Sequence, residues 1–183
     1  RRYEKAKEAV FKGDINEGPK SSKRIAGGEY NVAVGNSSLK ALTSGDYNLA
    51  MGINALTANT TGTRNIGIGP GALDAPDTEN DNLAIGYDAL GGTIAGGEYN
   101  VAIGNYSLDA ITSGDDNIAL GYKAMTDMTT GSYNIAIGFE AMENATTPGY
   151  NVAIGHQSLY GATDGTVMSG WSNTAVGYQS LYT

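Results

Sequence analysis

A five-residue pattern of the type Asn-Val-Ala-Ile-Gly returns along most of this 183-residue chain at a nearly constant interval. Its nine copies begin at Asn31, Asn48, Asn65, Asn82, Asn100, Asn117, Asn134, Asn151 and Asn173. Neighbouring copies are separated by 17 residues, except for one interval of 18 and a final one of 22. A fixed period of this kind indicates a repeat architecture, in which each unit buries its apolar face against the next.

Each unit is too short for a pair of helices and has room for short strands joined by turns. In the strand candidate 31–35, Val32 and Val34 point to one side and Ala33 to the other, because successive side chains of a strand alternate. A second apolar position follows each Asn by eight residues, at Leu39, Leu56, Leu73, Leu90, Leu108, Met125, Met142, Leu159 and Leu181. Glycines that precede several copies supply turn residues that tolerate positive φ, at Gly45, Gly62, Gly97, Gly114, Gly131 and Gly170. We therefore predict an all-β fold, a parallel β-solenoid (β-roll) of about nine 17-residue coils that rise ~4.8 Å each.

One apolar stripe of the predicted solenoid has no cover within the chain. The narrow coil suits Ala33, Ala50 and Ala84 inside, together with one Leu per coil, which leaves the Val and Ile residues outside unless the two faces are reversed. In either arrangement the strands are apolar on both faces, which is typical of strands buried on both. A continuous stripe of this kind marks an interface, and three coils packed around one axis would bury it. We predict a homotrimer; a monomeric solenoid with a wider core is the alternative.

The charge distribution separates residues 1–25 from residues 26–183. The first segment holds eight of the eleven Lys and Arg residues and has a net charge of +4, whereas the second carries −12. The stretch 1–13 has apolar residues on one helical face and ends at Gly13, so we expect a short basic helix that acts as a stem or docking segment. A solvated helix is the alternative, and residues 14–25 read as a polar linker. Residues 26–183 form the predicted solenoid domain, which breaks off in mid-repeat, as expected for part of a longer fibre.

Composition argues against several other classes of protein. The 27 glycines show no period of three, which excludes collagen, and no Cys is present to build a disulfide scaffold. No apolar run reaches the ~18 residues that a membrane span needs. The acidic repeats would repel the phosphates of a nucleic acid, so we expect no such partner.

The residues offer little basis for catalysis. The one His, His156, occupies a variable position after a strand candidate, and no nucleophile elbow, zinc motif or phosphate-binding loop is present. Acidic pairs such as Asp115–Asp116 read as solvated loop residues. The stretch 77–88 only faintly imitates an EF-hand, since it lacks the glycine at position six and runs into a strand. We predict a non-enzymatic protein without cofactor, catalytic residue or metal site; a loose surface Ca²⁺ site at 77–88 stays open.

Three rows of like residues would run along a solenoid of this period. The nine repeated asparagines are expected to form a structural ladder of stacked amides. Aromatic residues close to that ladder can pack on each other or face a sugar ligand, at Tyr30, Tyr47, Tyr99, Tyr133, Tyr150 and Trp171. Hydroxyl pairs form a third row, at Thr43–Ser44, Thr60–Thr61, Thr112–Ser113, Thr129–Thr130 and Thr146–Thr147. Ice-binding solenoids use flat Thr arrays, but these pairs lead into turns and read as structural.

The repeat resembles two families over residues 28–182, on the unit Tyr-Asn-Val-Ala-Ile-Gly-x-x-Ser/Ala-Leu. It is similar to the head repeats of trimeric autotransporter adhesins, which form a parallel β-roll trimer. It is still more similar to the repeats of bacteriophage tail fibres and related virion fibres. The 17-residue period favours the fibre branch, because adhesin head repeats usually run a few residues shorter.

The resemblance implies a mechanical function. We expect a structural fibre of a virion, a rigid homotrimeric rod that supports attachment to a glycan or protein receptor on the host surface. The N-terminal segment would contact other virion proteins, and the protein would be located on the extracellular virion. A bacterial adhesin head on the cell surface and an ice-binding β-solenoid are the alternatives.

Overall fold

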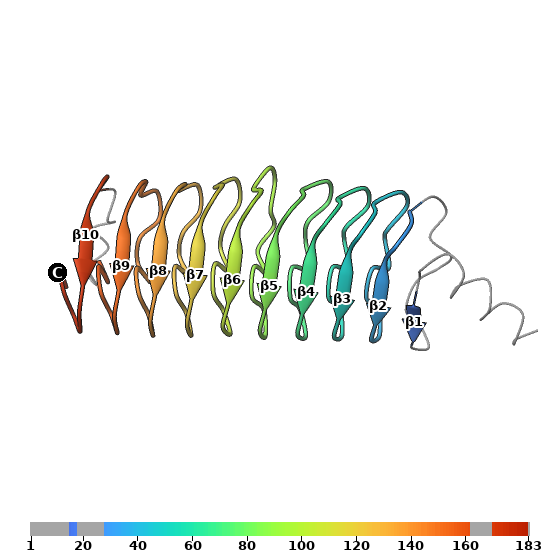
Figure 1. Cartoon of the computed structure of the whole chain (residues 1–183), viewed down its shortest axis with the longest axis horizontal. Helices are drawn as coiled ribbons and strands as arrows, with labels where there is room; N and C mark the ends of the chain where they lie inside the picture. Colours follow the sequence, from blue (N-terminus) through green and yellow to red (C-terminus); the bar gives the residue numbers. More distant parts are fainter. Residues whose placement is uncertain (1–14, 18–27, 162–169, 183) are drawn as a thin grey trace, which may run out of the picture.

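The computed structural model of the chain describes residues 15–17, 28–161 and 170–182, and these residues contain strands, turns and no helix (Figure 1). The strands are three residues long and form one sheet in sequence order. Their bounds are β1 Ile15–Glu17, β2 Val32–Val34, β3 Leu49–Met51, β4 Ile66–Ile68, β5 Leu83–Ile85, β6 Val101–Ile103, β7 Ile118–Leu120, β8 Ile135–Ile137, β9 Val152–Ile154 and β10 Thr174–Val176. The helix predicted over 1–13 lies outside the described residues.

Every neighbouring pair of strands is parallel and in register with the sequence repeat. Ala33 of β2 faces Ala50 of β3, and the same positions still face each other where the interval is longer, as between Ala153 of β9 and Ala175 of β10. The longer interval therefore leaves the register of the strands unchanged. The predicted parallel β-solenoid is confirmed. About seven complete turns, from β2 to β9, lie within residues 28–161. About nine coils were expected over residues 26–183, part of which lies outside the described residues.

A three-residue strand stands where the sequence indicated a polar linker. Ile15 to Glu17 form β1 and pair in parallel with β2, so that Asn16 lies opposite Ala33. The first strand of the repeat would otherwise present unpaired backbone N–H and C=O groups at the sheet edge. Backbone pairing does not depend on the repeat motif, and the motif therefore gave no sign of this strand.

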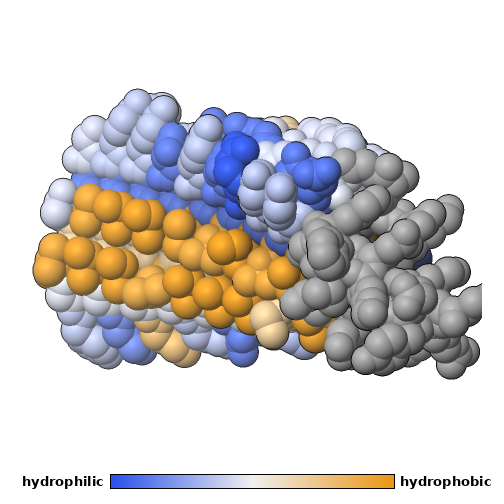
Figure 2. Space-filling view, turned by 45° about the vertical axis from the view of Figure 1, so that its right-hand side comes forward, coloured by the Kyte–Doolittle hydropathy of each residue, from blue (hydrophilic) through white to orange (hydrophobic). Residues whose placement is uncertain are grey.

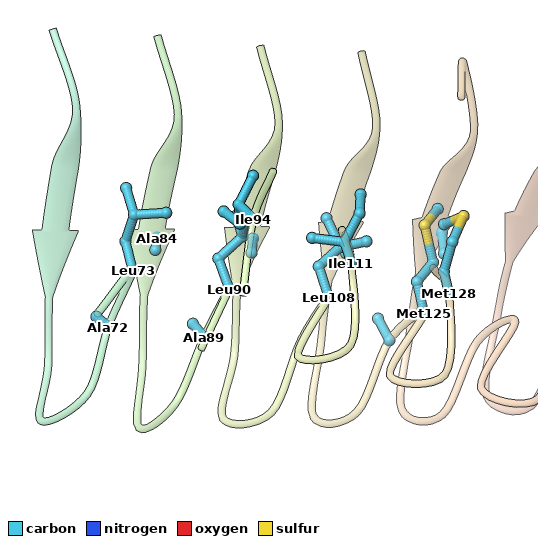
Figure 3. Close-up of a cluster of buried hydrophobic side chains, with 14 of the residues drawn as sticks. Ala72, Leu73, Ala84, Ala89, Leu90, Ile94, Leu108, Ile111, Met125 and Met128 are labelled. Carbon is cyan, nitrogen blue, oxygen red and sulfur yellow. The ribbon is translucent and has the colours of Figure 1, made fainter. Parts of the chain in front are cut away.

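The core is a column of small and medium-sized side chains inside the coil (Figure 3). The middle residue of each strand from β2 to β10 is buried, and Ala84 of β5 is fully so. Leu90 and Leu108 stack in the next row, and Ile94 and Ile111 form a further row beside them. The Ala face is therefore the inner one and the Val/Ile face the outer one, as expected from the narrow coil.

Two kinds of glycine allow the coils to approach closely. Gly35 ends β2 with a φ of 133°, and a Cβ there would lie 2.4 Å from the carbonyl oxygen of Gly52 in the next coil. Gly45 does not adopt positive φ, but a Cβ there would lie 2.1 Å from the carbonyl oxygen of Gly62. Turn glycines that tolerate positive φ were expected here, but none of Gly45, Gly62, Gly97, Gly114 and Gly131 adopts it. Positive φ instead occurs at the residue before each repeated Asn, as at Tyr30 with 61°.

Candidate functional site

The repeated asparagines lie one above another where the chain enters each strand. The backbone N–H of Asn65 donates to the Oδ1 of Asn48 at 2.9 Å, and the Nδ2 of Asn48 donates to the carbonyl of Gly62 at 2.8 Å. The backbone contact recurs in every described coil up to Asn173, and the ladder asparagines up to Asn151 are buried. These amides satisfy backbone groups that the fold buries, and their burial leaves them closed to a ligand.

In four of the five hydroxyl pairs the first member donates to the next coil, and the second member is exposed. Thr43 and Thr112 donate from Oγ1 to backbone carbonyls of the next coil, at 2.8 and 2.9 Å. Asp77 and Ala95 stand in this row where other coils have Thr. The backbone N–H of Thr60 donates to the carbonyl of Asp77, and the N–H of Ala95 donates to the carbonyl of Thr112. The row is therefore neither continuous nor free of internal hydrogen bonds.

The predicted aromatic row falls into separate groups. Tyr30 and Tyr47, here called the N-terminal pair, stack with ring centroids 4.9 Å apart. Tyr133, Tyr150 and Trp171, here called the C-terminal stack, have centroid spacings of 4.9 and 5.8 Å. All of these rings are exposed. Tyr99 is also exposed and has no ring neighbour in the part of the chain that the structure describes.

An ion pair and an acid interrupt the aromatic row between its two groups. Arg64 stands in the row and donates to Asp81 in the next coil from Nε at 2.6 Å and from Nη2 at 2.7 Å. This hydrogen-bonded pair lowers the pKa of the Asp81 carboxyl and raises the pKa of Arg64. Asp116 occupies the equivalent place directly before Asn117. Because Arg64 is exposed, the pair adds little to stability.

A second aromatic row, on the other side of the strands, was missed by the sequence analysis. Its six rings contact one another in succession with centroid spacings between 4.9 and 6.1 Å. Its members are Tyr87, Tyr106, Tyr122, Phe139, His156 and Tyr178. His156 is a stacking member here, between Phe139 and Tyr178. Aligning the residues directly after each strand-ending glycine would have revealed most of this row.

The outer face of the sheet forms an apolar face between the two aromatic rows, and Figure 2 shows it as a band along the rod bordered by hydrophilic residues. It consists of the first and third residues of β2 to β10, with Thr174 the one polar member. These side chains are half-buried or exposed, as the burial patterns of the strands show. Exposed apolar surfaces of this length are typical of interaction sites, which makes this face a candidate for one.

The acidic stretch at 77–82 has its central carboxylate occupied by the backbone. Glu79 is buried and accepts from the N–H groups of Asp77, Thr78 and Gly96 at 2.8 to 3.0 Å. Asp81 is held by Arg64. Within the described residues, no group of three or more His, Cys, Asp or Glu side chains is arranged to hold a metal ion.

Three other carboxylates, those of Asp74, Asp88 and Asp109, lie close enough to affect one another's ionisation. Burial raises the pKa of Asp74, and the charges of Asp88 and Asp109 add to the shift. Burial also raises the pKa of Asp109, with a further contribution from Asp88. Ionisation of Asp74 and Asp109 therefore costs the folded state free energy.

The described residues contain no helix that is long and apolar enough to cross a membrane. No protein-family model, curated protein or solved structure matches this chain.

Proposed function

We propose that this chain is a non-enzymatic structural fibre of a virion, a homotrimeric rod that supports attachment to the surface of a host cell. The apolar face is the observation that carries the proposal. Ile118 and Leu120 in the middle of the rod are 40% and 39% exposed in the single chain. Three copies around one axis would remove this face from water along its whole length.

The interior of the coil supports a mechanical role. Each coil is joined to the next by backbone hydrogen bonds such as the one from Val32 to Asn48 at 2.8 Å, by the asparagine ladder and by the core column. Stacked coils of this kind form a quasi-one-dimensional body whose length grows with the number of repeats. A rod of this kind suits the separation of a receptor-binding surface from the particle that carries it.

The resemblance to fibre repeats supports placing the rod on a virion. A bacterial adhesin head remains the second candidate because it shares the repeat and the trimeric β-roll that the resemblance implies. The ice-binding alternative has less support, since Thr43 and Thr112 donate their hydroxyls to the neighbouring coil and Asp77 and Ala95 interrupt the row.

Native mass spectrometry of the full chain at micromolar concentration tests the assembly. We expect one main species with three times the mass of a single chain, and a monomer that persists at this concentration would contradict the proposal. Immunogold labelling with antibodies against the chain tests the location. Label on particles supports the virion fibre, whereas label confined to the bacterial cell surface overturns it in favour of the adhesin head.

A further inference from the structure

A hollow lined by aromatic and hydroxyl side chains lies at the C-terminal stack. Its walls include Tyr133, Tyr150, Trp171, Thr130 and Thr147. The three rings come from three successive coils, because they stand just before β8, β9 and β10. All five side chains are exposed, so the hollow is open to solvent.

The rings of the stack leave part of their faces uncovered. The rings of Tyr133 and Tyr150 are nearly parallel, at 12°, with centroids 4.9 Å apart. Directly superposed rings in van der Waals contact would be about 3.5–4.0 Å apart, so the two rings are not in full face-to-face contact. Tyr133, Tyr150 and Trp171 accordingly remain 50%, 54% and 64% exposed. Trp171 lies against Gly149, where a Cβ would come within 3.0 Å of its ring.

Hydroxyl groups stand beside these rings with their hydrogen-bonding capacity unused. Thr129, the inner member of its pair, donates to the carbonyl of Thr146 at 3.1 Å. The hydroxyls of Thr130 and Thr147, the outer members, have no hydrogen-bond partner among the residues that the structure describes. Both side chains are therefore available to a ligand that carries hydroxyl groups.

The hollow is also free of charge, unlike the surroundings of the N-terminal pair. Ser132 and Gly149 precede the two tyrosines of the C-terminal stack, whereas Glu29 and Asp46 precede those of the N-terminal pair. Among the residues that the structure describes, none that lines the hollow is charged. The repeat region as a whole carries a net charge of −12, which disfavours an anionic ligand such as a sialylated or sulfated sugar.

We propose that this hollow binds a neutral oligosaccharide. The C–H faces of successive sugar rings would pack on the uncovered faces of the C-terminal stack, because aromatic faces carry negative partial charge and sugar C–H groups positive. Thr130 and Thr147 would hydrogen-bond the sugar hydroxyls at the margin. The inference rests on the proposed function. It identifies the receptor of the fibre as a neutral glycan and places the binding site at the C-terminal stack.

Trp171 is the one tryptophan of the chain and reports on the hollow directly. The full chain is titrated with hexamers of glucose in β-1,4 linkage, of glucose in α-1,4 linkage and of N-acetylglucosamine, and followed by tryptophan emission and calorimetry. Oligosialic acid of the same length is the charged comparison. We expect saturable binding to at least one neutral hexamer and none to oligosialic acid.

Three double variants place the binding on the chain. Tyr133→Ala/Tyr150→Ala removes two rings of the stack and should weaken binding about tenfold or more, because two ring contacts with the sugar are lost. Thr130→Val/Thr147→Val keeps the stack and should weaken binding to a smaller extent. Tyr30→Ala/Tyr47→Ala removes the N-terminal pair and should bind as the unchanged chain does.

The inference fails if no neutral hexamer binds, or if the N-terminal and C-terminal tyrosine variants bind equally. It also fails if Tyr133→Ala/Tyr150→Ala dissociates the assembly, because the hollow would then lie within the interface between copies. Native mass spectra of the same samples keep the two proposals apart. A trimer without glycan binding overturns the inference alone, and a glycan-binding monomer overturns the proposed assembly alone.

Discussion

The backbone N–H of Asn48 donates to the Oδ1 of Asn31, one coil earlier, at 2.9 Å. The Nδ2 of Asn31 donates in turn to the carbonyl of Gly45 at 2.8 Å. One buried amide thus satisfies both the start of the next strand and the turn that leads into it. Because each coil repeats this contact, loss of one amide leaves a donor and an acceptor unpaired inside the rod.

Asn117→Ala should destabilise the solenoid by about 2–4 kcal/mol, because two buried backbone groups lose their partners. The N–H of Asn134 donates to the Oδ1 of Asn117 at 3.0 Å. The carbonyl of Gly131 accepts from the Nδ2 of Asn117 at 2.8 Å. Urea unfolding followed by circular dichroism measures the loss. Asn36→Ala removes an exposed amide and should change stability by no more than ~0.5 kcal/mol. Equal unfolding midpoints for the two variants would contradict the role of the ladder.

The sequence period was sufficient to predict the strands β2 to β10 and their parallel register. Successive side chains of a strand alternate between its two faces. In β2, the side chains of Val32 and Val34 therefore share one face and Ala33 lies on the other. The narrowness of a 17-residue coil then favours Ala33 inside. The contacts that depend on loop conformation could not be obtained in this way, because loop residues vary from coil to coil while their backbone path does not.

Gly45 and Tyr106 illustrate two features of the fold that the sequence period does not predict. A glycine required for positive φ and a glycine required for close approach look the same in sequence, and at Gly45 the close approach is the reason. Tyr106 stands two residues after its strand-ending Gly104, whereas Tyr122 directly follows Gly121. The row that joins Tyr106 to Tyr122 at 6.1 Å depends on the three-dimensional stacking of the coils.

Gly104→Ala should be far more damaging than Gly96→Ala, although both glycines have positive φ, at 135° and 115°. A Cβ on Gly104 would lie 2.3 Å from the carbonyl oxygen of Gly121, whereas a Cβ on Gly96 would meet nothing within 4 Å. We expect a loss of about 1 kcal/mol at Gly96 from backbone strain alone and of more than about 4 kcal/mol, or failure to fold, at Gly104. Thermal unfolding of the two proteins provides the comparison. Similar melting temperatures would show that the coils are less closely packed at this position.

Acidification should relieve the cost of burying Asp74 and Asp109. Burial raises the pKa of each carboxyl in the folded chain above the ordinary value of 3.8. The folded state therefore binds protons more tightly than the unfolded state, and the destabilisation from these groups is present above the folded pKa and disappears as pH falls towards the ordinary value. The double variant Asp74→Asn/Asp109→Asn should melt at a higher temperature than the unchanged chain at neutral pH.

The same double variant should lose this advantage in acid, where the carboxyls of the unchanged chain are protonated as well. Melting temperatures measured from neutral pH down to the ordinary pKa of aspartate follow the difference. Asp127→Asn, on an exposed loop residue of another coil, is the control and should melt like the unchanged chain at each pH. An advantage that persists undiminished in acid would place its origin in something other than ionisation.

Leu120→Lys should convert the assembled protein to monomers while each chain keeps its solenoid. Leu120 stands on the apolar face, 39% exposed in the single chain, so a longer charged side chain there can reach water in the monomer. In a trimer the three ammonium groups would meet near the axis, and each would cost several kcal/mol of desolvation without a partner. Asp127→Lys places the same side chain on an exposed loop residue after β7 and should leave the assembly unchanged. Sedimentation velocity measures the mass, and circular dichroism verifies the fold. Unchanged assembly of Leu120→Lys would mean that the copies associate through another surface.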